Sequence, residues 1–354
     1  MDESDIRQGD GRPVGMKLSP AEIKQRILKV LHRIERPAGA SQIEELLRGW
    51  GVDLSERSIR LYLFRLDRDG MTKLQSRRAG RVLTAKGRAE VEQGDVIERT
   101  GFVSGQIDDL CYRMSFNLRA GLGTLVVNTT LLQARDEVSA LDVVRPVFAM
   151  RLGMGSRLLI LRPGAVYDLA RGAVVPRGRI AFVTICSVSL NGILLKEGVP
   201  VTSRFGGLLE FRNRLPARFV ELLEYRGTTQ DPLELFIRAR MTRVRECVQT
   251  GQGLVGASFR EFPSVALPAV LKVRDRLRLL GLDGIVAVGV PNQPLYGIPV
   301  GEGRTGLVVL GGLNPAAALE EAGVGNENRS LAGLLEYQKF PEYRHLNMCV
   351  RRGE

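Results

Sequence analysis

The sequence has 354 residues, with 44% hydrophobic and 25% charged residues, a net charge of +12 and a pI near 9.9. This length predicts two or three domains, and the surplus of positive charge favours a polyanionic partner. No apolar run approaches the roughly 18 residues of a membrane span, and the N-terminal stretch has no apolar core of a secretory signal. We therefore expect no membrane contact and a cytoplasmic location.

Residues that bind metals or activate nucleophiles are scarce. There are two histidines and four widely spaced cysteines, with no CxxC pair. A zinc site or a disulfide framework is therefore not expected, nor is a mechanism that needs a core histidine as general base. The P-loop and HExxH motifs are also absent. We expect no metal, no cofactor and no catalytic residue.

Three helices are predicted in the first part of the chain. Ser19 and Pro20 are typical of the start of a first helix. After the break at "PAGA", Ser41 and Glu44 have the spacing of a capping box that would begin a second helix. Ser55 would cap a third helix, in which apolar residues follow the helical period on one side.

A basic hairpin is predicted after the third helix, which would end at Gly70. A strand, the tip "SRRAG", a returning strand and a short helix follow. Three helices and a basic hairpin are typical of a winged helix-turn-helix. We therefore expect a disordered tail over residues 1–18 and a winged-helix DNA-binding domain over residues 19–94.

Positive charge is concentrated in residues 55–88, where ten Lys or Arg stand against three acidic residues and give a net charge of +7. The third helix would enter the major groove, where arginine to guanine is the commonest specific contact, and the hairpin would contact the backbone or the minor groove. A merely solvated charged face is the alternative. The expected DNA-binding residues are Ser55, Arg57, Arg60, Arg65, Arg77, Arg78 and Arg81.

Two residues of the third helix fit this interpretation poorly. Leu61 and Phe64 fall on its outward side, where polar residues are expected. Packing under the hairpin and a dimer contact are the two explanations that we consider.

The rest of the chain alternates strand-like and helical segments. Strand-like runs include residues 124–128, 180–186, 253–257 and 306–310. One helical pattern begins at "DP" (231–232), and another begins at "NP" (314–315) and stops at a glycine. This alternation predicts a mixed α/β domain over residues 95–340, followed by a C-terminal tail over residues 341–354.

Segments of this domain recur. "NGILLKEGVPVTSRFGGL" (191–208) and "YGIPVGEGRTGLVVLGGL" (296–313) share seven identities at a constant offset of 105. "RMS" and "RMT", two pairs of glycines (121 and 123, 251 and 253) and two "LLEY" segments (222–225, 334–337) also recur in order. We infer an internal duplication with halves near 100–228 and 229–340. The predicted fold class is α+β: a winged helix-turn-helix, then a mixed α/β regulatory domain built from two related halves.

A small-ligand site is expected where the halves meet. The segment "TICSVSLNG" and the residues after it offer hydroxyl, thiol and amide groups beside cations, which suits a carboxylate-bearing metabolite. Alternatively, the glycines serve tight turns and the cysteine is a small buried apolar side chain. The candidate effector-binding residues are Thr184, Cys186, Ser187, Asn191, Arg204, Gly206 and Gly207.

Residues 20–88 resemble the winged-helix domain named after ribonuclease R, and residues 95–340 resemble the regulatory domain of the NrpR family of nitrogen-regulation repressors. The motifs include "TGFVSGQIDDLCYRMSF", "TICSVSLNGILLKEGVPV", "YRGTTQDPLELFI" and "GGLNPAAALEEAG". The resemblance implies a homodimeric repressor that binds palindromic operators in double-stranded DNA and releases them when 2-oxoglutarate accumulates. It does not assign the effector-binding residues.

Two other functions remain open on the sequence alone. One is an enzyme acting on a metabolite or nucleotide, with Cys186 as nucleophile and the winged helix as a targeting module. The other is an RNA-binding regulator, because the winged helix is of the ribonuclease type.

Overall fold

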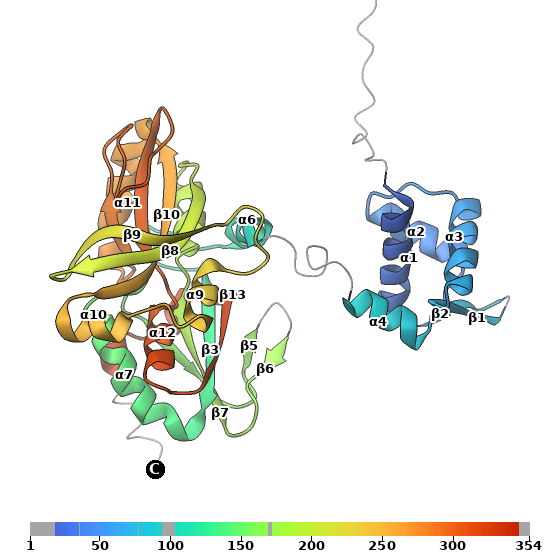
Figure 1. The fold of residues 1–354 in the computed structure, drawn as a ribbon, viewed down its shortest axis with the longest axis horizontal. Helices are drawn as coiled ribbons and strands as arrows, with labels where there is room; N and C mark the ends of the chain where they lie inside the picture. Colours follow the sequence, from blue (N-terminus) through green and yellow to red (C-terminus); the bar gives the residue numbers. More distant parts are fainter. Residues whose placement is uncertain (1–17, 35, 77, 94–102, 169–171, 347–354) are drawn as a thin grey trace, which may run out of the picture. The chain divides into compact units, whose positions relative to one another are not determined.

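The computed structural model describes residues 18–34, 36–76, 78–93, 103–168 and 172–346 (Figure 1). The predicted disordered tail lies outside these ranges except for Leu18. The chain divides into two compact units, residues 1–100 and 101–354. Each unit is described by itself.

The first unit is a winged helix, as predicted. Three helices enclose a small apolar core in which Ile27, Ile43, Ile59 and Leu63 are fully buried. A two-stranded antiparallel hairpin and a fourth helix follow them. The elements are α1 (Pro20–Ile34), α2 (Ala40–Gly49), α3 (Glu56–Arg68), β1 (Thr72–Ser76), β2 (Gly80–Leu83) and α4 (Ala85–Gln93).

The predicted caps are confirmed at α1 and α3. Ser19 and Glu22 hydrogen-bond reciprocally at the start of α1, and the Ser55 side chain accepts a bond from the Ser58 amide. The predicted capping box of α2 is wrong, because the helix begins one residue before Ser41 and Gly39 is its N-cap. Ala38 forms a bridge with Arg81 of β2, and the extended Gly39 follows it directly. This tertiary contact sets the earlier start of the helix.

The second unit consists of two halves whose main elements follow one another in the same order. The first half contains α6 (Val103–Arg113), β3 (Thr124–Gln133), η1 (Ala134–Asp136), α7 (Glu137–Ala149), β4 (Leu158–Leu161), β5 (Val166–Asp168), β6 (Ala173–Val174), β7 (Arg179–Ile185), α8 (Ser189–Lys196), β8 (Thr202–Arg212) and β9 (Leu215–Glu224). The second half contains α9 (Pro232–Arg238), α10 (Val244–Thr250), β10 (Gly253–Pro263), η2 (Ser264–Ala266), α11 (Leu267–Leu279), β11 (Ile285–Val288), β12 (Arg304–Leu310), α12 (Asn314–Glu321), β13 (Asn326–Glu336), η3 (Tyr337–Lys339) and η4 (Tyr343–His345). Among the described residues, β5, β6 and β9 are present only in the first half.

The two halves exchange their last equivalent strands. One sheet has the order β4-β7-β3-β13 and the other the order β11-β12-β10-β8-β9. β13 of the second half therefore pairs with β3 of the first, and β8 of the first half pairs with β10 of the second. Four strands of each sheet correspond, β9 is additional, and each sheet is completed by a strand from the other half.

The internal duplication is confirmed, but the offset of 105 is wrong. The elements match at larger offsets: β3 begins at Thr124 and β10 at Gly253, which is 129 residues, and α8 begins at Ser189 and α12 at Asn314, which is 125 residues. The repeated glycine pairs follow this register, whereas the two "LLEY" segments do not, because β9 has no counterpart. The recurrence at 105 residues therefore aligns α8 with a loop before β12.

Matching hydrogen bonds support the larger offset. The amide of Cys186 donates to the Val126 carbonyl at 2.8 Å, and the amide of Gly311 donates to the Gly256 carbonyl at the same distance. The Ser189 side chain also donates to the Val126 carbonyl, and the Asn314 side chain to the Gly256 carbonyl, each at 2.9 Å. Both helices are thus attached to their central strand in the same way.

Three further expectations need correction. The helical pattern that begins at Asp231 forms two helices, because Arg240 takes a φ of 56° and ends the first. Asn314 does not cap α12; its side chain bonds to Gly256 instead. Residues 341–346, expected to begin a tail, pack on the unit with Tyr343 and Leu346 buried.

The halves also touch at the turns that precede α8 and α12. The Thr184 hydroxyl donates to the Gly312 carbonyl at 2.7 Å. A Cβ atom at Gly312 would lie 2.1 Å from the Ile185 carbonyl oxygen, which is far closer than two such atoms can approach. This contact across the pseudo-twofold axis therefore requires glycine.

We predict that Gly312→Ala lowers the free energy of unfolding of the second unit by about 1–3 kcal/mol, because the added methyl forces the two turns apart. Gly325→Ala, where nothing lies within 4 Å of a Cβ atom, is the control and should stay within about 0.5 kcal/mol of the parent. Urea unfolding followed by far-UV circular dichroism measures both. Trp50, the single tryptophan, reports the first unit separately by fluorescence, and equal midpoints for the two variants would contradict the prediction.

Candidate functional site

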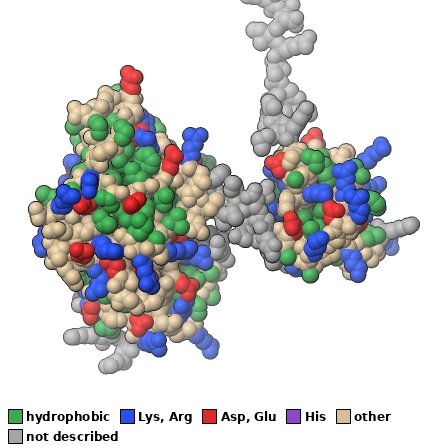
Figure 2. Space-filling model, viewed as in Figure 1, with side chains coloured by type: hydrophobic (Ala, Val, Ile, Leu, Met, Phe, Trp, Pro, Cys, Tyr) green, Lys and Arg blue, Asp and Glu red, His purple; other side chains and the backbone are tan. Residues whose placement is uncertain are grey.

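The outward side of α3 carries exposed arginines. Arg57, Arg60 and Arg65 are all exposed, and Ile59, Leu63 and Leu66 on the opposite side are buried. Figure 2 shows Lys and Arg side chains gathered where α3 lies in this unit. The guanidinium of Arg60 pairs with Glu56 at 2.6 Å across one helical turn, and that of Arg65 lies 5.7 Å from the Tyr62 ring centre. Both contacts are exposed and leave the arginines available to a partner.

The predicted DNA-binding arginines of the hairpin differ in exposure. Arg78 is exposed at the tip, and Arg77 lies outside the described residues. Arg81 is partly buried and pairs with Asp67 of α3 at 2.7 Å, while the Thr72 hydroxyl donates to the same carboxylate at 2.6 Å. Arg81 therefore fixes the hairpin against α3 in this structure.

Arg260 on β10 is the largest completely buried side chain of the second unit. Its Nε donates to Asn191 Oδ1 at 2.7 Å, its Nη1 to Ser258 Oγ at 2.7 Å and its Nη2 to the Ser187 carbonyl at 3.0 Å. Within the described part of the chain, no carboxylate oxygen lies within 4 Å of this guanidinium. Arg260 is thus a buried positive charge held by neutral hydrogen-bond acceptors.

The structure brings some of the predicted effector residues together around Arg260. Ser187 and Asn191 contact it directly from the turn before α8 and from α8 itself. Thr184 lies at the end of β7 and contacts Gly312 instead. Cys186 is buried, and burial raises the pKa of its thiol to about 12. A thiol with this pKa is not an activated nucleophile.

The remaining predicted residues lie on β8. The guanidinium of Arg204 pairs with Glu261 at 2.5 Å and donates to the Pro299 carbonyl. A Cβ atom at Gly206 would meet Pro232 at 2.7 Å, and one at Gly207 would meet the Glu221 carbonyl at 2.3 Å. The space over both glycines is therefore filled by the protein.

Two further titratable groups lie buried in this region. Burial, and next the negative charge of Glu234, raise the pKa of Asp231 from 3.8 to about 6. Burial also raises the pKa of Tyr225 well above 10. The Asp231 carboxylate caps α9 through the Leu233 amide at 2.8 Å. The Asp231 charge acts on Arg260 through space, without a direct ion pair, and the Tyr225 hydroxyl stays neutral.

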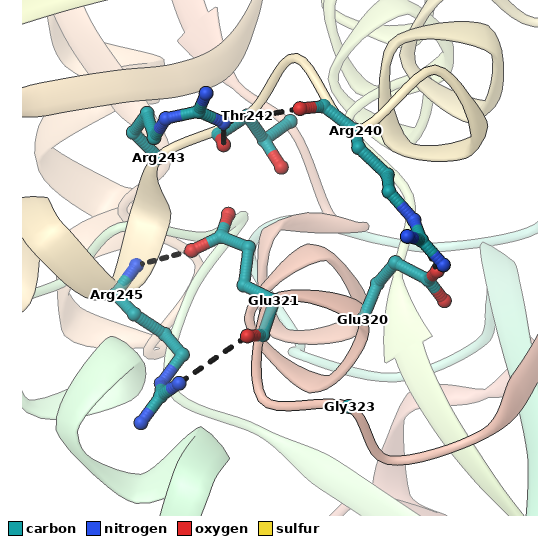
Figure 3. Close-up of a pocket in the computed structure, with 7 residues that line it drawn as sticks. All are labelled: Arg240, Thr242, Arg243, Arg245, Glu320, Glu321 and Gly323. Atoms are coloured by element: carbon teal, nitrogen blue, oxygen red, sulfur yellow. Dashed lines mark hydrogen bonds and ion pairs between the residues drawn. The ribbon is translucent and has the colours of Figure 1, made fainter.

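A pocket of about 470 Å³ lies elsewhere, between the segment 240–245 and the end of α12 (Figure 3). Two of its charged side chains, Glu321 and Arg243, bind backbone groups of the pocket itself. The Glu321 carboxylate accepts from the amides of Val244 and Arg245, and Arg243 donates to the carbonyls of Arg240 and Thr242. The pocket contains none of the predicted effector residues.

Sequence reasoning missed Arg260. One signal was present: the run "GLVGASFREF" is apolar apart from Ser258, Arg260 and Glu261, and β10 is buried on both faces. Charged residues are almost never fully buried unless they are partnered. An arginine at the centre of a buried strand therefore marks a site of interest.

No group of three or more His, Cys, Asp or Glu residues in the described ranges is arranged to hold a metal ion. Among the same residues, no helix has the length and apolar character needed to cross a membrane. The expected cytoplasmic location stays a prediction.

We predict that the free energy of unfolding decreases as the pH rises from about 4 to about 6, because of Asp231. Its pKa of about 6 in the folded protein exceeds 3.8, so the folded state binds the proton more tightly and loses about 3 kcal/mol relative to the unfolded state as the pH rises through this window. Asp231→Asn keeps a good N-cap and should remove this contribution. The measurement is the free energy of unfolding of both proteins from pH 4 to pH 7.

Asp142→Asn, which removes a carboxylate that is 65% exposed, is the control and should follow the parent. Parallel curves for the parent and Asp231→Asn would contradict the assignment.

Comparisons with known proteins give the family. The family model for the NrpR regulatory domains NRD1 and 2 matches residues 100–342, and the ribonuclease R winged-helix domain matches residues 25–91. The chain is 32% identical to the global nitrogen regulator NrpRI of Methanosarcina mazei, over 89% of this chain and 96% of that protein.

Two longer relatives agree. The global nitrogen regulators NrpR of Methanococcus maripaludis and Methanocaldococcus jannaschii are each 28% identical to the chain, which covers 52% and 50% of their lengths. The chain thus spans about half of these two proteins. A solved nitrogen repressor-like protein from Methanococcus jannaschii aligns with a TM-score of 0.57 at 26% identity, over 68% of this chain and 98% of its own.

These relatives are regulators, so the alternative of an enzyme with Cys186 as nucleophile is set aside. The matching regulatory domains cover more than half of the chain and the winged helix precedes them in the expected order. The chain belongs to the NrpR family of nitrogen regulators.

Proposed function

We propose that the chain represses genes of nitrogen metabolism by binding palindromic operators in double-stranded DNA as a homodimer, and that it releases them on binding 2-oxoglutarate. The observation that carries the proposal is the row of exposed arginines on α3 of a winged helix, joined in one chain to an NrpR regulatory unit.

DNA binding follows from the chemistry of α3. In a winged helix the third helix lies in the major groove, where arginines contact guanine edges or phosphates. Arg57, Arg60 and Arg65 are exposed on this helix and Arg78 at the hairpin tip. We assign the α3 arginines to bases and phosphates and Arg78 to the backbone, with Arg81 positioning the hairpin through Asp67. Arg77 stays a predicted contact.

A second copy has a suitable surface on the edge strand β9. This strand ends its sheet, and Leu215, Val220, Leu222 and Leu223 on it are exposed. Figure 2 shows apolar side chains gathered over β8 and β9. Edge strands with exposed apolar residues invite pairing, and antiparallel pairing of β9 with itself gives the self-complementary contact of a twofold dimer.

Arg260 supports a carboxylate effector. A buried guanidinium without a carboxylate partner is costly, and a dicarboxylate such as 2-oxoglutarate would neutralise it. We propose that one carboxylate of the effector pairs with Arg260 beside Ser187 and Asn191. Thr184, Cys186, Arg204, Gly206 and Gly207 stay predicted contacts that require a shift of a neighbouring element.

Movement follows from the filled space around Arg260. Arg260 has no exposed surface, and Pro232 at the start of α9 packs against Gly206, so a ligand reaches Arg260 only when a neighbouring element shifts. An effector that binds the shifted state more tightly moves the population toward it. We propose that the shift changes the spacing of the two winged helices, which no longer match consecutive half-sites.

RNA binding is the second candidate, because the winged helix matches the ribonuclease R type. A mobility shift that compares duplex DNA with structured RNA separates the two. Tighter binding of structured RNA at equal salt would favour the alternative.

We predict that Arg57→Ala weakens operator binding by about 1–3 kcal/mol, whereas Arg78→Ala weakens binding to all duplexes alike. Fluorescence anisotropy on a promoter fragment from the gene's own neighbourhood, compared with unrelated duplexes of equal length, measures both and also gives the number of chains per duplex. Arg135→Ala, which removes an exposed charge from the other unit, is the control. Unchanged binding by Arg57→Ala would refute the placement of α3 in the groove.

We predict that Asn191→Asp weakens the effector response without loss of DNA binding. The new carboxylate would lie 2.7 Å from Arg260 Nε, neutralise it in place of the effector and repel the incoming carboxylate. The 2-oxoglutarate concentration that releases half of the DNA should rise at least tenfold, or ~1.4 kcal/mol. Asn213→Asp, the same change on the exposed turn before β9, is the control. A normal response in Asn191→Asp would remove Arg260 from the effector site.

A further inference from the structure

The outward face of α3 carries two large apolar side chains as well as arginines. Leu61 is 50% exposed and Phe64 is 63% exposed. Both point away from the core residues Ile59 and Leu63 of the same helix. Packing under the hairpin, one of the explanations drawn from the sequence, is excluded by these exposed fractions.

Arginines surround this apolar pair. Arg57 and Arg65 lie four residues before and after Leu61, and Arg60 and Arg68 lie four residues before and after Phe64. Residues four apart are neighbours on a helix surface, and all four arginines are exposed. Two apolar side chains thus form the centre of a face whose periphery is cationic.

This combination restricts what covers the pair. A second α3 packed across a twofold axis would set four arginines against four arginines, which is unfavourable at close range. The major groove of DNA offers the complementary pattern: phosphates on both sides and, on the floor, the C5-methyl groups of thymines. It is wide enough for an α-helix.

We propose that Leu61 and Phe64 bind thymine C5-methyl groups on the floor of the major groove and so make the protein select thymine at specific operator positions. This inference rests on the DNA binding proposed above and goes beyond it. The arginines supply affinity and guanine contacts, and the apolar pair distinguishes thymine from the other bases, which present no methyl group there.

The test removes the methyl group alone. The chain with both units selects tight-binding duplexes from a random library, and each thymine of the selected site is then replaced singly by uracil, which pairs with adenine in the same way. Fluorescence anisotropy at fixed salt should show that the affinity for the duplex falls about fourfold, or by ~0.8 kcal/mol, when uracil replaces one or two symmetry-related thymines. At the other thymines the replacement should have no effect.

Variants link the effect to the two side chains. Leu61→Ala or Phe64→Ala should bind the thymine duplex more weakly and bring the thymine-to-uracil affinity ratio at the sensitive positions to about one. Arg57→Ala should bind more weakly but keep the ratio. Leu279→Ala, which truncates a side chain that is 77% exposed in the other unit, is the matched control and should change neither value. Trp50 fluorescence confirms that the winged helix of each variant is folded.

The outcomes separate this inference from the proposed function. Tight duplex binding with no sensitive thymine, or a selected site without thymine, overturns the inference and leaves DNA binding intact. A thymine-to-uracil affinity ratio that persists in both alanine variants overturns the inference as well. If these variants also become monomers while the ratio is unchanged, Leu61 and Phe64 belong to a contact between copies of the chain. Failure to bind any duplex overturns the proposed function, and the inference with it.

Discussion

The exchange of β8 and β13 between the two halves is the constraint on which the second unit depends. Each sheet is complete only with a strand from the other half, so separation of the halves would break two long antiparallel ladders. The halves therefore cannot open like two domains on a hinge. Conformational change in this unit has to come from the helices and turns that pack on the sheets, while the sheets themselves stay paired.

This constraint explains why the junction contains a buried polar cluster. β10 is the strand that receives β8 from the other half, and Arg260 extends from β10 to Ser187 and Asn191 of the first half. Its hydrogen bonds thus link the halves a second time, close to the contact between Thr184 and Gly312. A ligand that competes for Arg260 acts on the elements of both halves at once.

Local chemistry made the first unit predictable from the sequence. The caps at Ser19 and Ser55 and the helical period of the apolar residues act within a few residues, so the helices and the hairpin follow from the chain alone. The cap of α2 failed as a prediction because Ala38 is held by a strand more than forty residues away. A helix start that is set by tertiary contact has no local signature.

The second unit shows the opposite balance. Its strands and the existence of a repeat could be predicted, but the register at 105 residues was wrong because glycines recur in unrelated turns. The strand exchange and the burial of Arg260 depend on contacts between residues far apart in sequence. Of the candidate effector residues, Ser187 and Asn191 contact Arg260 directly, while Gly206 and Gly207 lie against packed protein. Polar residue types predict a polar cluster, and only the fold determines which of them share it.

The composition of α3 follows from what charge alone can achieve on DNA. Contacts between arginines and phosphates give affinity that depends on salt and is nearly independent of sequence. A regulator of particular genes needs contacts that differ between base pairs, and on the major-groove floor these are hydrogen bonds to base edges and contact with the thymine methyl. Arginines on α3 can donate hydrogen bonds to base edges, but they have no apolar surface for the thymine methyl. Without a partner, Leu61 and Phe64 would lower the solubility of an exposed helix. Among four arginines on a helix that we place in the major groove, their proposed partner is the thymine C5-methyl, the apolar group of the groove floor.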